Sequence, residues 1–125
     1  MFRVLSYKTN KGEAKMKKLN SLPLWNTKGN AYRGDTGYRN TGKTAFDVVK
    51  FECTELGNYG DFEHLNTIML RELKRYSADD IIWVTKSKRQ AKHYGEVYLV
   101  YMTGNERIIA TDGDNGFLIL KRKAR

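Results

Sequence analysis

The sequence has very little cysteine and proline. Cys53 is the single cysteine among 125 residues, and Pro23 is the single proline. One cysteine excludes an internal disulfide and a cysteine-based zinc site. The two histidines, His64 and His93, lie far apart and show no ligand spacing such as H-x-x-x-H, so we expect no metal site.

Long apolar runs are also missing. The longest, IIWV and GFLIL, are far shorter than the ~20 residues that span a bilayer. The N-terminal stretch MFRVLSYKTNKGEAKMKK lacks an apolar core that ends in a small-residue cleavage site. We therefore expect a cytoplasmic protein with neither a membrane segment nor a secretory signal.

The remaining composition is that of one globular domain. Apolar residues make up 40% of the chain and aromatic residues 12%, enough for a core in a chain of this length. Residues 8–20, KTNKGEAKMKKLN, are too polar to bury, and residues 1–21 are expected to form a basic N-terminal segment. Residues 22–125 are expected to form a single domain.

Positive charge is concentrated at the two ends of the chain. Residues 1–43 contain ten Lys or Arg and two acids. Residues 44–85 contain four Lys or Arg and eight acids, and residues 86–125 contain nine Lys or Arg and four acids. The net charge is +9. Such a distribution attracts polyanions, whether a nucleic acid or the pyrophosphate of a dinucleotide.

Periodicity and turn signals indicate an α+β fold, in which helices precede a run of mostly antiparallel strands. Segment 61–76 has helical spacing with Asp61 as N-cap, and 88–94 is a short helix after Ser87, ended by Gly95. Segment 44–56 fits a helix or a strand. The expected strands are 2–7, 31–33, 81–85, 96–102, 107–111 and 117–121.

GYRNTGKT, residues 37–44, matches the phosphate-binding pattern G-x-x-x-x-G-K-[ST]. Such a loop binds phosphate when it follows a buried strand of a parallel sheet and is followed by a helix. The preceding NTKGNAYRGDT contains no apolar strand, and the chain lacks an alternating order of strands and helices. We therefore interpret the match as accidental.

The preceding residues AYRG suggest a different anion site. An arginine that a short strand places between an aromatic residue and a glycine can donate two hydrogen bonds to phosphate oxygens. Arg33 is that candidate. Some fifty residues later, IIWVTKSKRQAKHYG places Thr85 at the end of an apolar strand, before a short helix ending in Tyr94 and Gly95.

Together, these segments resemble the small bacterial and viral members of the ADP-ribosyltransferase superfamily, over roughly residues 30–120. The resemblance lies in Tyr-Arg-Gly, an apolar strand ending in Thr, a helix of the form Ala-x-x-Tyr-Gly, and the strand EVYLVYM. It implies a split pair of β-sheets with an NAD cleft between them, in which Arg33 and Thr85 converge.

The resemblance also implies roles for individual residues. Tyr32, Arg33 and Gly34 would bind NAD, with the arginine on a phosphate or ribose. Thr85 would support the nicotinamide half of the site. Tyr94 would lie near the nicotinamide or pack the helix against the cleft.

The family usually has a glutamate on a late strand, often two residues after another Glu or Gln, and this chain has no such pair. The available late acids are Glu106, Asp112 and Asp114, of which the two aspartates occur at a strand end. Cleavage of the nicotinamide–ribose bond builds positive charge on the sugar, which a carboxylate stabilises. The expected activity is transfer of ADP-ribose from NAD to a protein or nucleic-acid acceptor.

Two alternatives remain open at this point. The charge of +9, with eight tyrosines and two tryptophans, also suits a nucleic-acid-binding protein that stacks bases on aromatic rings. The missing glutamate pair suits a catalytically inactive interaction or inhibitor protein with the same fold. The sequence indicates neither the acceptor nor the oligomeric state.

Overall fold

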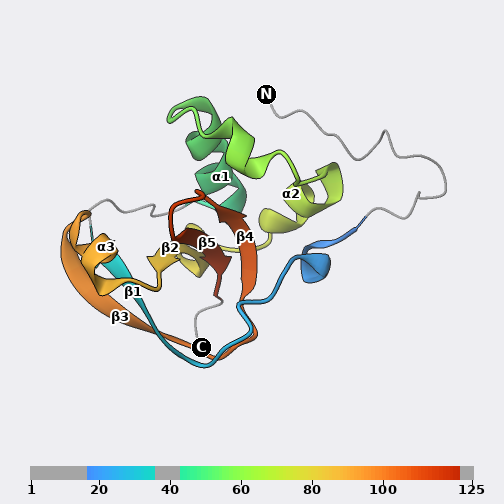
Figure 1. Ribbon diagram of the computed structural model, residues 1–125. Coiled ribbons are helices and arrows are strands. Elements are labelled where there is room, and N and C mark those ends of the chain that lie inside the picture. Colours follow the sequence, from blue (N-terminus) through green and yellow to red (C-terminus); the bar gives the residue numbers. More distant parts are fainter. Residues whose placement is uncertain (1–16, 36–42, 122–125) are drawn as a thin grey trace.

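The structure is a computed structural model that describes residues 17–35 and 43–121 (Figure 1). The expected strand 2–7, most of the GYRNTGKT segment and the basic stretch 122–125 lie outside these ranges. The described part is α+β, as predicted. Its strands are β1 (Gly29–Asp35), β2 (Ile81–Thr85), β3 (Glu96–Met102), β4 (Arg107–Thr111) and β5 (Gly116–Leu120), and its α-helices are α1 (Ala45–Thr54), α2 (Thr67–Leu73) and α3 (Lys88–Lys92).

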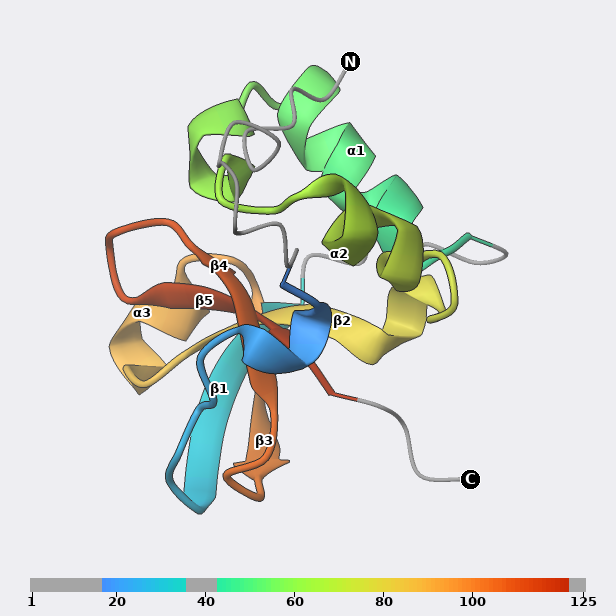
Figure 2. The ribbon, with the colours of Figure 1, turned by 90° about the vertical axis from the view of Figure 1, so that its right-hand side faces the viewer.

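The five strands form one sheet in the order β3-β1-β2-β5-β4, and every pair is antiparallel. The sheet has two parts. β1 and β3 pair along their whole length, and β2, β5 and β4 form a second ladder. The single register pair Tyr32↔Thr85 joins β1 to β2. Figure 2 shows the β1–β3 ribbon running away from the other three strands.

Each face of the sheet contributes to a separate core. Ile81 and Trp83 of β2 face a cluster with the inner sides of α1 and α2. Val84 faces the opposite way and packs with Ala31 and Trp25 in a second cluster, to which β3 and β5 also contribute. Alternate side chains of a strand point to opposite faces, so the two clusters lie on the two sides of β2.

The sequence EVYLVYM forms β3 within the predicted bounds and has one core face, as expected. Val100 and Met102 are buried in the second cluster. Leu99 and Tyr101, at the alternate positions, are 63% and 58% exposed. β3 is also the last strand in the sheet order, so its outer edge has no strand partner within the described residues.

The ambiguous segment 44–56 contains α1, which begins with a capping box. The Thr44 hydroxyl accepts a hydrogen bond from the Asp47 N–H (3.2 Å), and the Asp47 carboxylate accepts one from the Thr44 N–H (3.0 Å). This reciprocal pair satisfies N–H groups that have no partner within a helix. The pKa of Asp47 is lowered mainly by the hydrogen bond from the Thr44 backbone.

The predicted start of the second helix at Asp61 is wrong. Residues Tyr59–Phe62 form a short 3₁₀ turn, and α2 begins after Asn66. The Asn66 side chain accepts a hydrogen bond from the Met69 N–H (2.8 Å), and asparagine is as good an N-cap as aspartate. The periodic pattern extends across the turn because apolar residues on both sides of it face the same core.

α3 follows the prediction closely. The Ser87 hydroxyl accepts a hydrogen bond from the Gln90 N–H (3.1 Å), so Ser87 is the expected N-cap. Beyond the helix, Gly95 has a φ of +131°, which favours glycine strongly.

Two glycines allow α3 to lie directly against β1. A Cβ atom at Gly34 would overlap the Ala91 carbonyl oxygen and lie 2.8 Å from the Tyr94 Cβ, and one at Gly95 would overlap the Asp35 carbonyl oxygen. Both overlaps involve backbone atoms that cannot rotate away. The Tyr-Arg-Gly and Ala-x-x-Tyr-Gly motifs therefore pack against each other through their glycines.

The packed region begins before Leu22, where the domain was expected to start. Leu19 is buried in the first core cluster, and its N–H donates a hydrogen bond to the Glu72 carboxylate (2.7 Å). Within the described ranges, no helix has the length and apolar character needed to cross a membrane.

Gly34→Ala is expected to destabilise the protein by about 2–3 kcal/mol, because the added methyl group overpacks a contact with backbone atoms. The midpoint of denaturant unfolding would measure the change. Gly60→Ala is the matched control, since nothing lies within 4 Å of a Cβ there. A Gly34→Ala variant as stable as Gly60→Ala would show that β1 and α3 are not in close contact.

Candidate functional site

The segments that suggested a site meet in one row across the sheet. Thr85, at the end of β2, pairs with Tyr32 of β1 on one side and with Gly116 of β5 on the other. The turn that contains Asp112 and Asp114 leads directly into Gly116. Three parts of the chain that are far apart in sequence thus lie side by side at one end of the sheet.

Arg33 and Thr85 lie on adjacent strands, but their side chains leave opposite faces. Directly paired residues of an antiparallel ladder share a face, so Thr85 lies on the side of Tyr32. Arg33 is on the other side, with Ala31 and the second core cluster. This register does not give the expected shared cleft between the guanidinium and the hydroxyl.

The Thr85 side chain has a structural role. It is 5% exposed, and its hydroxyl oxygen accepts a hydrogen bond from the Ser87 N–H (3.1 Å). This bond turns the chain at the end of β2, directly before the Ser87 cap of α3. The hydroxyl is thereby engaged in positioning α3, and little of it reaches solvent.

Lys86, which no sequence pattern singled out, lies on the face of Arg33. Its ammonium group is 5.3 Å from the centre of the Trp25 ring and 5.9 Å from that of Phe117. The two rings meet edge to face, with centroids 5.2 Å apart. Cation–π contacts of this kind hold a lysine over the rings without neutralising its charge.

Arg33 and Lys86 form a pair of cations on this face. The register pair Tyr32↔Thr85 places them on one face, at diagonal positions of adjacent strands. In residues 17–35 and 43–121, no hydrogen bond or ion pair engages the guanidinium of Arg33. The cross-strand partner of Arg33 is Tyr98, which adds an aromatic ring to the same face.

Gly34 and Tyr94 are explained by packing. Gly34 is the position where α3 touches β1, and the Tyr94 Cβ is part of that contact. The rest of the Tyr94 side chain is open, because the residue is 53% exposed. The Cβ atom of Tyr94 thus packs α3 against β1.

Asp112 and Asp114 lie in the exposed turn between β4 and β5, as predicted. One carboxylate oxygen of Asp112 accepts hydrogen bonds from the N–H groups of Asp114 (2.7 Å) and Gly116 (3.0 Å). Asp112 is therefore engaged in forming the turn. The side chain of Asp114 is exposed at the tip and makes no such bond in the described region.

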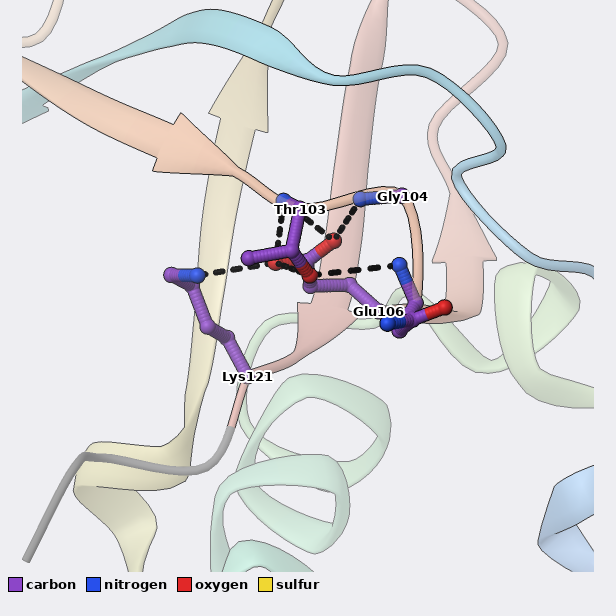
Figure 3. Close-up of polar contacts among 5 residues, drawn as sticks. Thr103, Gly104, Glu106 and Lys121 are labelled. Carbon is purple, nitrogen blue, oxygen red and sulfur yellow. Dashed lines mark hydrogen bonds and ion pairs between the residues drawn. The ribbon is translucent and has the colours of Figure 1, made fainter.

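The third late acid, Glu106, is buried and fully engaged (Figure 3). It is 5% exposed, and its carboxylate accepts hydrogen bonds from the N–H groups of Thr103 and Gly104 and from the Lys121 ammonium group (2.8 Å). Burial raises the pKa of this carboxyl, but the hydrogen bonds from Lys121 and Thr103 outweigh burial and lower it to about 2. Glu106 ties the β3–β4 turn to the end of β5.

The described part of the phosphate-loop match is also used structurally. Thr44 caps α1, and the Lys43 carbonyl accepts a hydrogen bond from the Ala78 N–H (2.8 Å). No parallel strand pair occurs among the described strands. A phosphate loop needs a glycine-rich turn after a buried strand of a parallel sheet, and this setting is different.

Cys53 packs in the first core cluster, and burial, reinforced by Glu52, raises its pKa to about 11. No group of three or more His, Cys, Asp and Glu side chains suited to a metal ion occurs within residues 17–35 and 43–121. The Arg33 face carries cations and aromatic rings together with the carboxylates of Asp35 and Glu96, and the Glu96 carboxylate accepts a hydrogen bond from the Tyr98 hydroxyl (3.4 Å).

A separate hollow of about 330 Å³ lies along β4. It is lined by part of β4, Pro23 and the segment that contains Asp61 and His64. The ring Nε2 of His64 is 2.7 Å from the Ile109 carbonyl oxygen. β4 is at the opposite edge of the sheet from β3, so this hollow is separate from the row at Thr85.

Comparison with known proteins gives no match: no family model, curated protein or solved structure is significantly similar to this chain. The function is therefore inferred from the geometry described above.

Glu106→Gln is expected to destabilise the protein at neutral pH by about 3 kcal/mol, the free energy that corresponds to a pKa lowered from 4.5 to about 2. The folded pKa is the lower one, so this stabilisation is present above the unfolded pKa. It is lost as the pH falls from 4.5 toward 2.

Unfolding by denaturant at a series of pH values would test this. The difference between wild type and Glu106→Gln should shrink on acidification. Glu63→Gln, at an exposed position, is the control. A constant difference across this pH range would mean that the charge of Glu106 does not stabilise the fold.

Proposed function

We propose that this protein binds NAD on the face of Arg33 and transfers ADP-ribose to a macromolecular acceptor, as ADP-ribosyltransferases do. One observation carries the proposal. The segments of the resemblance, which are far apart in sequence, are adjacent in the sheet: Tyr32 beside Thr85, Thr85 beside Gly116, and Gly34 against Tyr94. These contacts lie on the face of the sheet opposite to Arg33, so they bring the segments of the resemblance together without forming a shared cleft.

The two-part sheet supports the same proposal. A split pair of sheets is what the resemblance implies, and here one register pair joins the β1–β3 ribbon to the other three strands. Figure 2 shows β1 and β3 running away from the other three strands.

Arg33 and Lys86 suit the pyrophosphate of a dinucleotide. A guanidinium can donate two parallel hydrogen bonds to phosphate oxygens, and an ammonium group adds a flexible point charge. The two cations are diagonal neighbours on one face, and neither forms an ion pair with a carboxylate within the described residues. Tyr98 and the partly buried Phe117 supply aromatic surface next to them, and Trp25 lies in the core beneath Lys86.

Transfer breaks the bond between the ribose C1′ and the nicotinamide nitrogen, and the bonding electrons leave with nicotinamide. An oxygen or nitrogen nucleophile of the acceptor forms the new bond to C1′ and releases its proton to a carboxylate or to water. A carboxylate near C1′ stabilises the positive charge that develops on the sugar. We assign this role to Asp114, because Asp112 is engaged in the turn.

A binding protein without transferase activity is the second candidate. It is favoured by the engagement of Asp112 in the turn and by the burial of the Thr85 hydroxyl. Both observations reduce the number of polar groups available for catalysis without affecting the Arg33 face. Binding and transfer are therefore tested separately.

Arg33→Ala and Lys86→Gln are each expected to weaken NAD binding about tenfold or more, since each removes a charge-assisted interaction worth roughly 1.5–3 kcal/mol. The rise in melting temperature with millimolar NAD, and titration calorimetry, would measure the effect. Lys43→Ala, an exposed lysine outside this face, should leave binding unchanged. If Lys43 is the critical residue and ATP with magnesium stabilises the chain instead, the phosphate-loop interpretation is correct.

Asp114→Asn should reduce transfer of label from NAD to acceptors in a cell lysate by roughly 10²–10³-fold, as removal of one preorganised electrostatic partner does. NAD binding should be retained, because the substitution does not touch the cations. Binding of NAD by wild type without any transfer of label would support the inactive binding protein.

A further inference from the structure

The charges of the described residues are divided between two halves of the molecule. The β1–α3–β3 part, residues 28–35 and 86–102, contains six Lys or Arg and two acids, whereas residues 43–85, which contain α1 and α2, have five and eight. The segment 86–95 has four Lys or Arg and no acid. A polyanion is therefore attracted to the β1–α3–β3 part and repelled from the helical half.

The three most exposed apolar and aromatic side chains of the positive half lie on one face, and Tyr98, which is 43% exposed, lies on the other. Leu99 and Tyr101 of β3 are 63% and 58% exposed, and Tyr94, after α3, is 53% exposed. Leu99 pairs with Tyr32, and Val97, one step along the same face, pairs with Gly34, where α3 is packed. Tyr94, Leu99 and Tyr101 thus lie on the α3 side of the ribbon, and we call them the tyrosine face.

Three basic residues belong to α3, which packs on the same side of the ribbon as the tyrosine face. Lys88, Arg89 and Lys92 are exposed positions of α3, immediately before Tyr94. In the described chain none of the three makes an ion pair with a carboxylate. Proteins that bind single-stranded nucleic acid stack the unpaired bases on exposed aromatic rings and bind the phosphates with neighbouring cations.

We infer that the tyrosine face, with the basic side of α3, binds single-stranded nucleic acid. The bases would stack on Tyr94 and Tyr101, with Leu99 between them, and the phosphates would follow Lys88, Arg89 and Lys92. Single strands fit better than a duplex because the face presents rings, and rings need unstacked bases. An acidic peptide would use the cations but would leave the rings without specific partners.

This inference goes beyond the proposed NAD site and uses different residues. Arg33 and Lys86 lie on the opposite face of the sheet from Tyr32 and Leu99, because alternate residues of a strand face opposite ways. Nucleic acid on the tyrosine face would therefore leave the cations of the NAD site free. If the chain is a transferase, nucleic acid is then the acceptor class that this surface favours.

The test uses the full chain and a short fluorescent oligothymidylate or single-stranded RNA, with binding followed by anisotropy over a series of salt concentrations. Tyr101→Ala is expected to weaken binding at least about fivefold, because one base can no longer stack. Lys92→Gln should weaken binding and reduce the salt slope by about 1, because one lysine–phosphate interaction is removed. Both substitutions are at exposed positions, so folding should be preserved.

Matched controls come from the helical half. Phe51→Ala removes an aromatic residue that is 42% exposed on α1, and Lys50→Gln removes an exposed lysine beside it. Neither should change the affinity of the tyrosine face. Melting temperatures of all four variants would verify that the fold is intact.

Several results would overturn the inference. Equal losses in the control variants would assign binding to net charge alone, and equal affinity for a duplex would remove the role of the rings. Self-association that Tyr101→Ala abolishes, without nucleic-acid binding, would assign the face to a second copy of the chain. The Tyr101→Ala variant should bind NAD with unchanged affinity, because the proposed NAD site is on the other face, so NAD binding tests the proposed function separately.

Discussion

The contact between β1 and α3 through Gly34 and Gly95 is the constraint on which the arrangement of the sheet depends. The two parts of the sheet share only one register pair, Tyr32↔Thr85, and one pair is weak compared with a full ladder. α3 follows β2 directly and lies on β1, so it ties the β1–β3 ribbon to the end of β2. Backbone atoms on both sides of the contact leave no room for a side chain at either glycine.

Polar contacts stabilise parts of the fold that lie outside the two apolar clusters. Glu106 joins the β3–β4 turn to Lys121 after β5, and so links the ribbon to the opposite ladder at its far end. A buried carboxylate is stabilising only when its lone pairs are satisfied, and here backbone N–H groups and one ammonium group satisfy them. The sheet is thus held at both ends, by a glycine contact at one and by a charge network at the other.

The sequence was a good guide to strands and a poor one to side-chain direction. The strands 81–85, 96–102 and 107–111 have the predicted bounds because each is β-branched and lies between turn residues. Helix starts were harder, since Asp61 and Asn66 are both capable caps and only the tertiary contacts of the turn select one. Thr85 was assigned to the site and Lys86 was not, because the face of a strand end is set by pairing register, which no local pattern encodes.

Register also explains how one narrow ribbon can offer two different surfaces. On β1 and β3, Arg33 and Tyr98 face one way, while Tyr32, Leu99 and Tyr101 face the other. A slip of one residue would exchange the faces and would bring Arg33 to the side of α3. Gly34 forbids that slip, because any residue other than glycine at its position would clash with Ala91 and Tyr94. The packing of one glycine therefore decides which side of the ribbon presents Arg33 and Tyr98 and which presents the tyrosine face.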